Sequence, residues 1–188
     1  MQAETETRSL VHSSLHGIAK TISLTGWITF WVQLTLVVVS GLVLLFASTG
    51  RRFATQQNTG IGIGIFWAVC AVVALLFSVY WYFRYTRIAK RLDNPNPALH
   101  PTKADTIRII EVGIMVGLLG MLLALVGSGA TLGVLVAKSI SQPPGVAIVD
   151  PNKIIRALDV FVMVANINGI AAHFIGTVAS LWLLQKLR

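Results

Sequence analysis

Four long stretches of this chain contain no Asp, Glu, Lys or Arg: residues 21–50, 53–83, 112–137 and 160–185. Each is at least 26 residues long, whereas about 20 apolar residues cross the roughly 30 Å hydrocarbon core of a bilayer. Charged residues make up 12% of the 188 residues, against about 25% in soluble domains. These runs exclude a soluble globular domain, and with it an ordinary soluble enzyme.

The apolar runs predict an all-α, integral membrane four-helix bundle. Only helices and closed barrels pair every backbone polar group within lipid. The runs are continuous rather than alternating between apolar and polar residues, which favours helices. We expect a single transmembrane domain over residues 24–187, with spans at about 24–46, 61–83, 112–137 and 160–184.

Residues 1–23 are expected to form a cytoplasmic N-terminal segment. Within 9–23, apolar residues recur at helical spacing on one face, and Ser, His and Lys occupy the other. This pattern is typical of an amphipathic helix that lies on the membrane surface. We therefore expect an interfacial helix before the first span.

Two sequence signals predict where the later helices begin. Thr102-Lys-Ala-Asp105 resembles a capping box, which places the start of the third helix near residue 103. Asp150-Pro151 is typical of an N-cap followed by proline in the first turn. The fourth helix is therefore expected to begin near 151, unless a short interfacial helix precedes it.

The distribution of basic residues predicts that both termini are cytoplasmic. The two terminal segments and the 84–111 connection hold ten Lys and Arg residues, and the other two connections hold five. Cytoplasmic loops are the richer in basic residues. We assign the formal net charge of +8 to orientation and to anionic lipid headgroups rather than to nucleic acid.

Small residues form a stripe on each of the last two helices. The third helix carries Gly113, Gly117, Gly120 and Gly127, with Ala124 and Thr131 in the same series. The fourth carries Gly169 and Gly176, in series with Ala165, Ala172 and Ala179. Small residues let helix backbones approach closely in lipid, so we expect these two helices to pack along their stripes. The alternative is that one stripe forms a subunit interface.

A polar stripe on the fourth helix supplies the main candidate site. His173 lies deep within a span, where an ionisable residue is by default a functional candidate. Its face of the helix also holds Asp159, Met163, Asn166, Thr177 and Ser180. Imidazole suits iron, copper, nickel and zinc, and a carboxylate adds a hard oxygen ligand, so His173, Asn166, Met163 and Asp159 are candidates for lining a cation path. The alternative is that His173 and Asn166 make interhelical hydrogen bonds.

The remaining histidines and the single cysteine are weaker candidates. His12 and His16 lie four residues apart and have the spacing to chelate a metal, with a solvated amphipathic face as the alternative. His100 is expected to be exposed among prolines, and Cys70 to be a small packing residue. We find no phosphate-binding loop and no nucleophile–base constellation, so we do not expect an enzyme.

Several strings of residues, mostly in the second half of the chain, are long enough to point to a family. They are Ala104-Asp105 leading into Gly113-Ile-Met-Val-Gly-Leu-Leu-Gly-Met121, Ala130-Thr-Leu-Gly-Val-Leu-Val-Ala-Lys138, Ala157-Leu-Asp-Val-Phe161 and His173-Phe-Ile-Gly176 with Ser180-Leu181. With them, the chain resembles the chloroplast inner-envelope family called "permease in chloroplasts", also described as a subunit of the inner-envelope protein-import translocon, and its cyanobacterial relatives.

The resemblance implies a four-helix membrane protein and two different functions, iron permeation and protein import. It fits a cyanobacterial protein of the plasma or thylakoid membrane. Our first hypothesis is a permease for metal cations, with iron as the transported ion, acting as a homo-oligomer or within a membrane complex. The alternative is a non-transporting, translocon-like or assembly scaffold. The deciding feature is whether the polar stripe of the fourth helix faces a wet cavity or a dry helix contact.

Overall fold

The computed structural model describes residues 2–52, 59–141 and 155–187, and within these ranges the chain is helical without strands. Four long helices carry the fold: α1 (Gln2–Arg52), α2 (Thr59–Leu92), α3 (Lys103–Ile140) and α4 (Ala157–Leu187). A short 3-10 helix, η1 (Pro97–Leu99), lies between α2 and α3. Each long helix is apolar enough to cross a membrane. The structure thus confirms the predicted all-α four-helix membrane bundle.

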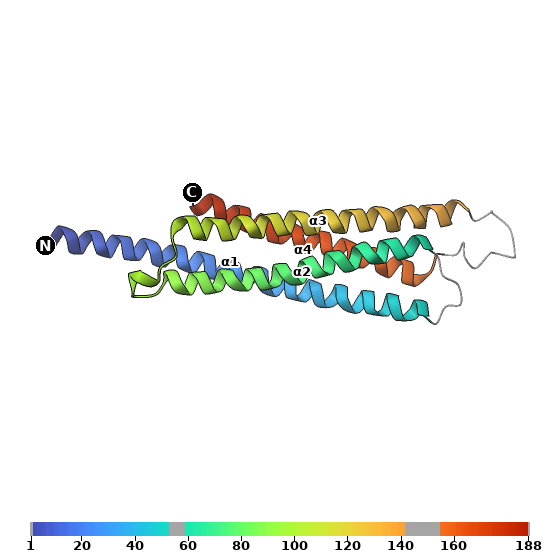
Figure 1. The fold of residues 1–188 in the computed structure, drawn as a ribbon, viewed down its shortest axis with the longest axis horizontal. Coiled ribbons are helices and arrows are strands. Elements are labelled where there is room, and N and C mark those ends of the chain that lie inside the picture. The colour runs from blue at the N-terminus through green and yellow to red at the C-terminus, as the bar shows by residue number, and fades with distance from the viewer. Residues whose placement is uncertain (1, 53–58, 142–154, 188) are drawn as a thin grey trace.

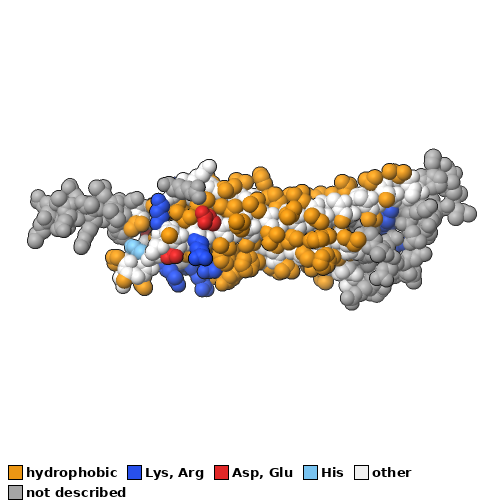
Figure 2. All heavy atoms as spheres, turned by 45° about the horizontal axis from the view of Figure 1, so that its top comes forward, with side chains coloured by type: hydrophobic (Ala, Val, Ile, Leu, Met, Phe, Trp, Pro, Cys, Tyr) orange, Lys and Arg blue, Asp and Glu red, His pale blue; other side chains and the backbone are white. Residues whose placement is uncertain are grey.

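The four helices run side by side along one axis (Figure 1). α1 and α3 each pack against both α2 and α4, and α2 also touches α4. Both chain ends lie at the same end of the bundle as the α2–α3 connection (Figure 1); we call this the terminal end. Figure 2 shows a hydrophobic belt across the middle of the face in view, with Lys and Arg gathered where the belt meets the terminal end.

The expected break between a surface helix and the first span is absent. α1 is one continuous helix through residues 9–23 and into the span. The prediction of a separate interfacial helix is therefore wrong, and these residues form the first part of α1. No proline interrupts the chain at this point. Over residues 15–23, whose side chains the structure describes, the apolar face serves helix packing, because Ala19 and Ile22 are buried.

The partner that buries this part of α1 is the end of α2. α2 continues to Leu92 rather than ending near residue 83. Its Tyr85 and Ala89 join Ala19 and Ile22 in one hydrophobic cluster, to which α4 adds Leu183. The bundle therefore extends past the predicted spans at the terminal end.

The capping signals meet different outcomes. The Thr102 hydroxyl accepts a hydrogen bond from the Asp105 N–H at 3.1 Å, and α3 begins at Lys103, as predicted. Residues 155 and 156 are not helical, so a helix running on from residue 151 is wrong. The carboxylate of Asp159 accepts from the Arg156 N–H at 3.1 Å, which supports a start at Ala157. Asp150-Pro151, and any interfacial helix there, fall outside the described residues.

Replacing Ile22 with alanine tests the corrected role of α1. Ile22 is 1% exposed, whereas Leu24, two residues on, is 60% exposed. Removing a fully buried Ile side chain costs about 2 kcal/mol or more, so Ile22→Ala should lower the free energy of unfolding by that amount, measured by denaturant titration in micelles. Leu24→Ala is the matched control and should change it by less than about 1 kcal/mol. Equal effects would contradict the packing of α1 against α2.

Candidate functional site

The polar stripe of α4 faces the interior of the bundle. The side chains of Asn166, His173 and Ser180 are fully buried, and those of Asp159 and Thr177 nearly so. The helical spacing brings all five onto one inward face, as expected. Met163, on the same face, is half-buried.

The glycines of α3 make the room that these polar side chains need. A Cβ atom added to Gly120 would collide with the imidazole ring of His173. One added to Gly127 would collide with the Asn166 amide oxygen, and one at Gly117 with the hydroxyl of Thr177. The small-residue stripe of α3 therefore packs against the polar stripe of α4.

This packing corrects the expected contact between two small-residue stripes. Among the glycines of the two stripes, Gly169 is the one whose added Cβ would approach the opposite stripe, at 3.3 Å from the Cβ of Ala124. Elsewhere the small face of α4 turns toward α1 and α2, with Gly176 against the Gln33 amide of α1. Gly113 of α3 likewise faces Tyr85 of α2. The physical reason is the size of the polar side chains, because the imidazole of His173 and the amide of Asn166 fit where the opposite helix has glycine.

The hydrogen bonds of His173 and Asn166 are few. The Nε2 atom of His173 lies 3.4 Å from the carbonyl oxygen of Ala71 on α2, which is an interhelical contact of the expected kind. Asn166 instead donates to the Val162 carbonyl of its own helix at 3.1 Å. The other polar atoms, His173 Nδ1 and Asn166 Oδ1, have no partner among the described residues.

The residues of α1 and α2 that meet this polar stripe, Gln33, Tyr82 and Tyr85, are not predicted by the spacing of residues in the sequence. The Gln33 amide donates to the Ala172 carbonyl at 3.1 Å. The Ser180 hydroxyl lies 3.0 Å from the Tyr82 hydroxyl and 3.2 Å from that of Tyr85. The position of both tyrosines near the end of a span favours the headgroup level, but both are buried. Gln33 could have pointed to this group from the sequence, because a polar amide within an uncharged span needs a hydrogen-bond partner inside the bundle.

Asp159 is engaged by a lysine that the sequence places outside the spans. Its Oδ2 atom lies 2.5 Å from the Nζ atom of Lys138 on α3. The two side chains are only 5% and 7% exposed. Because α3 continues to Ile140, Lys138 belongs to the bundle rather than to the connection. Its ammonium offsets the charge of the carboxylate that we considered as a metal ligand.

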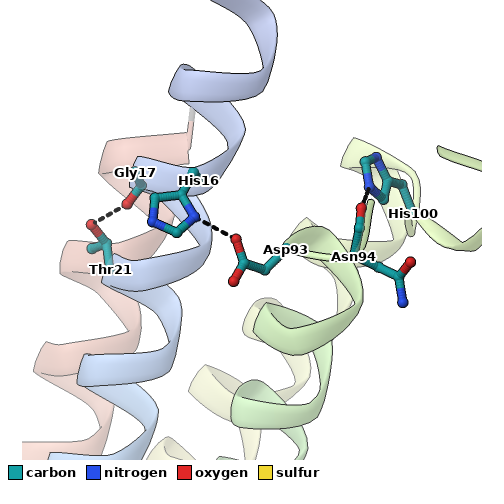
Figure 3. A network of polar contacts seen from close by, with 6 residues as sticks. All are labelled: His16, Gly17, Thr21, Asp93, Asn94 and His100. Atoms are coloured by element: carbon teal, nitrogen blue, oxygen red, sulfur yellow. Dashed lines mark hydrogen bonds and ion pairs between the residues drawn. The ribbon is translucent and has the colours of Figure 1, made fainter. Parts of the chain in front are cut away.

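The other metal candidates lie apart from this stripe. The side chain of His12 is outside the described residues. His16 Nδ1 lies 2.5 Å from the Asp93 carboxylate, and Figure 3 shows this contact joining α1 to the end of α2. His100 approaches the Asn94 carbonyl at 2.7 Å, and Cys70 is half-buried. The described residues contain no group of three or more His, Cys, Asp or Glu that could hold a metal ion.

Four apolar helices around a buried polar interior define a multi-pass integral membrane protein. The chain belongs to the family described as "Protein of unknown function (DUF3611)", which it matches over residues 12–188. It is 37% identical over 167 residues to Protein TIC 21, chloroplastic, of Arabidopsis thaliana. That match covers 86% of this chain and 54% of the relative, so the chain spans about half of its length. The resemblance to the chloroplast inner-envelope family is thereby confirmed. No solved structure matches significantly.

Proposed function

We propose that this chain is a non-transporting subunit of a membrane protein complex, in which the four-helix bundle serves as a scaffold. The observation that carries the proposal is the contact between His173 and Gly120. His173 is 0% exposed, so the residue at the centre of the candidate path occupies the space that an ion would need.

The contacts on either side of His173 support the same proposal. The Thr177 hydroxyl fills the space over Gly117 and donates to the His173 carbonyl at 2.8 Å. Asn166 fills the space over Gly127. Close contacts over about three turns of α4 favour a dry helix interface. The resemblance to a translocon subunit family favours membership in a complex.

Two measurements on the wild-type protein test this proposal. In proteoliposomes, the folded and inserted protein should give no ferrous iron uptake above empty liposomes. Extracted from its own membrane in mild detergent, it should migrate in a stable assembly with other proteins. Saturable uptake that His173→Ala abolishes, while the variant still folds, would overturn the scaffold proposal.

A metal cation permease is the second candidate function, with iron as the transported ion. The observation in its favour is the set of buried atoms that have no partner within the part of the chain that the structure describes, including His173 Nδ1, Asn166 Oδ1 and the Gln33 amide oxygen. Buried polar groups are nearly always hydrogen-bonded, and a water or an ion can complete those that protein atoms leave without a partner. The liposome experiment separates the two candidates, because this one requires flux from the chain alone or from its homo-oligomer.

A further inference from the structure

A groove of about 450 Å³ lies between α1 and α2 at the terminal end. We propose that it binds one acidic glycerophospholipid from the surrounding leaflet. Lys20 and Lys90 would hold the phosphate, and an acyl chain would lie on Leu24 and Trp27. All four residues line the groove.

The cationic part of the groove is free to take an anion. Lys20 and Lys90 are both exposed, and neither ammonium has an ion pair or hydrogen bond among the described residues. The groove also contains the carboxylate of Asp93, which is already engaged by His16 at 2.5 Å. Figure 3 shows the His16 ring turned toward that carboxylate. Of the basic side chains that line the groove, the two lysines are therefore the ones without a partner among the described residues.

The apolar part of the groove begins where the charged part ends. Lys20 is the last charged residue before the uncharged stretch 21–50. Leu24 and Trp27, one and two turns further along α1, are 60% and 40% exposed. The Trp27 ring also stacks on that of Trp31, with centroids 6.1 Å apart, so the aromatic surface continues toward the membrane centre. Tryptophan rings of this kind favour the headgroup level.

A lipid fits this groove better than a soluble anion does. A free phosphate would use only the two lysines, whereas most of the lining is apolar. Lysines near a membrane surface attract anionic headgroups, and their methylene stems cover apolar surface while the ammonium stays at the headgroup level. The groove joins both features, and its lining residues belong to the terminal end of the bundle, where Figure 2 shows Lys and Arg gathered beside the hydrophobic belt.

Native mass spectrometry of the full chain in micelles tests this site. Phosphatidylglycerol and phosphatidylcholine with identical acyl chains are the two probes. We expect phosphatidylglycerol to be retained preferentially, and Lys20→Gln with Lys90→Gln to weaken its binding about tenfold. The matched control is Lys103→Gln with Arg108→Gln, which removes two exposed charges of α3 at the same end and should change binding less than about twofold.

A third variant and a soluble competitor test the acyl-chain part. Leu24→Asn should weaken lipid binding, and millimolar glycerol 3-phosphate should leave the bound lipid in place. Equal retention of both lipids, or an equal loss in the control pair, would overturn the site. Displacement by glycerol 3-phosphate would assign the groove to a soluble phosphate instead and would overturn the lipid proposal.

Discussion

Replacing Gly120 with valine is expected to lower the free energy of unfolding by about 3 kcal/mol. A Cβ atom at this position would collide with the fully buried ring of His173, and overpacking of a close-packed interior costs about 1–3 kcal/mol. Valine adds two further methyl groups, so we expect the upper end of that range. Denaturant titration in micelles measures the change.

Gly129 on the same helix provides the matched control. A Cβ atom there would meet nothing within 4 Å, so Gly129→Val makes the same chemical change without the collision. It should shift the free energy of unfolding by less than about 0.5 kcal/mol. His173→Ala in the Gly120→Val background should recover part of the loss, because residues in contact couple by about 0.5–3 kcal/mol. Equal losses at Gly120 and Gly129 would contradict the contact of His173 with α3.

Removing the charge of Asp159 is expected to lower the free energy of unfolding by a similar or greater amount. Asp159→Asn keeps the shape of the side chain but leaves the ammonium of Lys138 unpaired at 7% exposure. Breaking a buried ion pair from one side costs about 3–5 kcal/mol. Replacing both partners, with Lys138→Met and Asp159→Leu together, should cost much less, because no charge then remains buried.

The same substitution at an exposed pair is the control. Asp93 also pairs with a base, His16, but the two side chains are 47% and 62% exposed. Exposed ion pairs contribute about 0–1 kcal/mol, so Asp93→Asn should change stability by no more than that. An Asp159→Asn variant that is as stable as Asp93→Asn would show that Lys138 reaches water without its partner.

The four spans were predictable because lipid excludes charge, and uncharged runs of this length are rare in soluble proteins. The start of α3 was predictable because the Thr102 cap is a local interaction. The continuation of α1 was not, because an amphipathic pattern over 9–23 fits a membrane surface and a helix interface equally well. The helix interface is the correct one of the two, because α1 packs against the end of α2. The many basic residues at that end predicted a connection outside the membrane, although Tyr85 and Ala89 between them are buried.

The face of α4 that carries His173 could also be predicted, but not what it meets. A stripe of glycines accommodates either another small face or a polar side chain, and the register between α3 and α4 determines which. Lys138 shows the same limit, since its pairing with Asp159 depends on how far α3 extends. Contacts between helices depend on tertiary packing, and the spacing of residues within one helix does not predict which helix they will meet.

The length of α1 has a mechanical consequence. Its 51 residues make a rod of about 76 Å at 1.5 Å per residue, more than twice the roughly 30 Å of the hydrocarbon core. Its first turns project beyond the other helices (Figure 1). Further along, Ile22, Val37 and Leu44 pack against the neighbouring helices, so a force that a partner applies to those turns is passed to the whole bundle rather than to α1 alone.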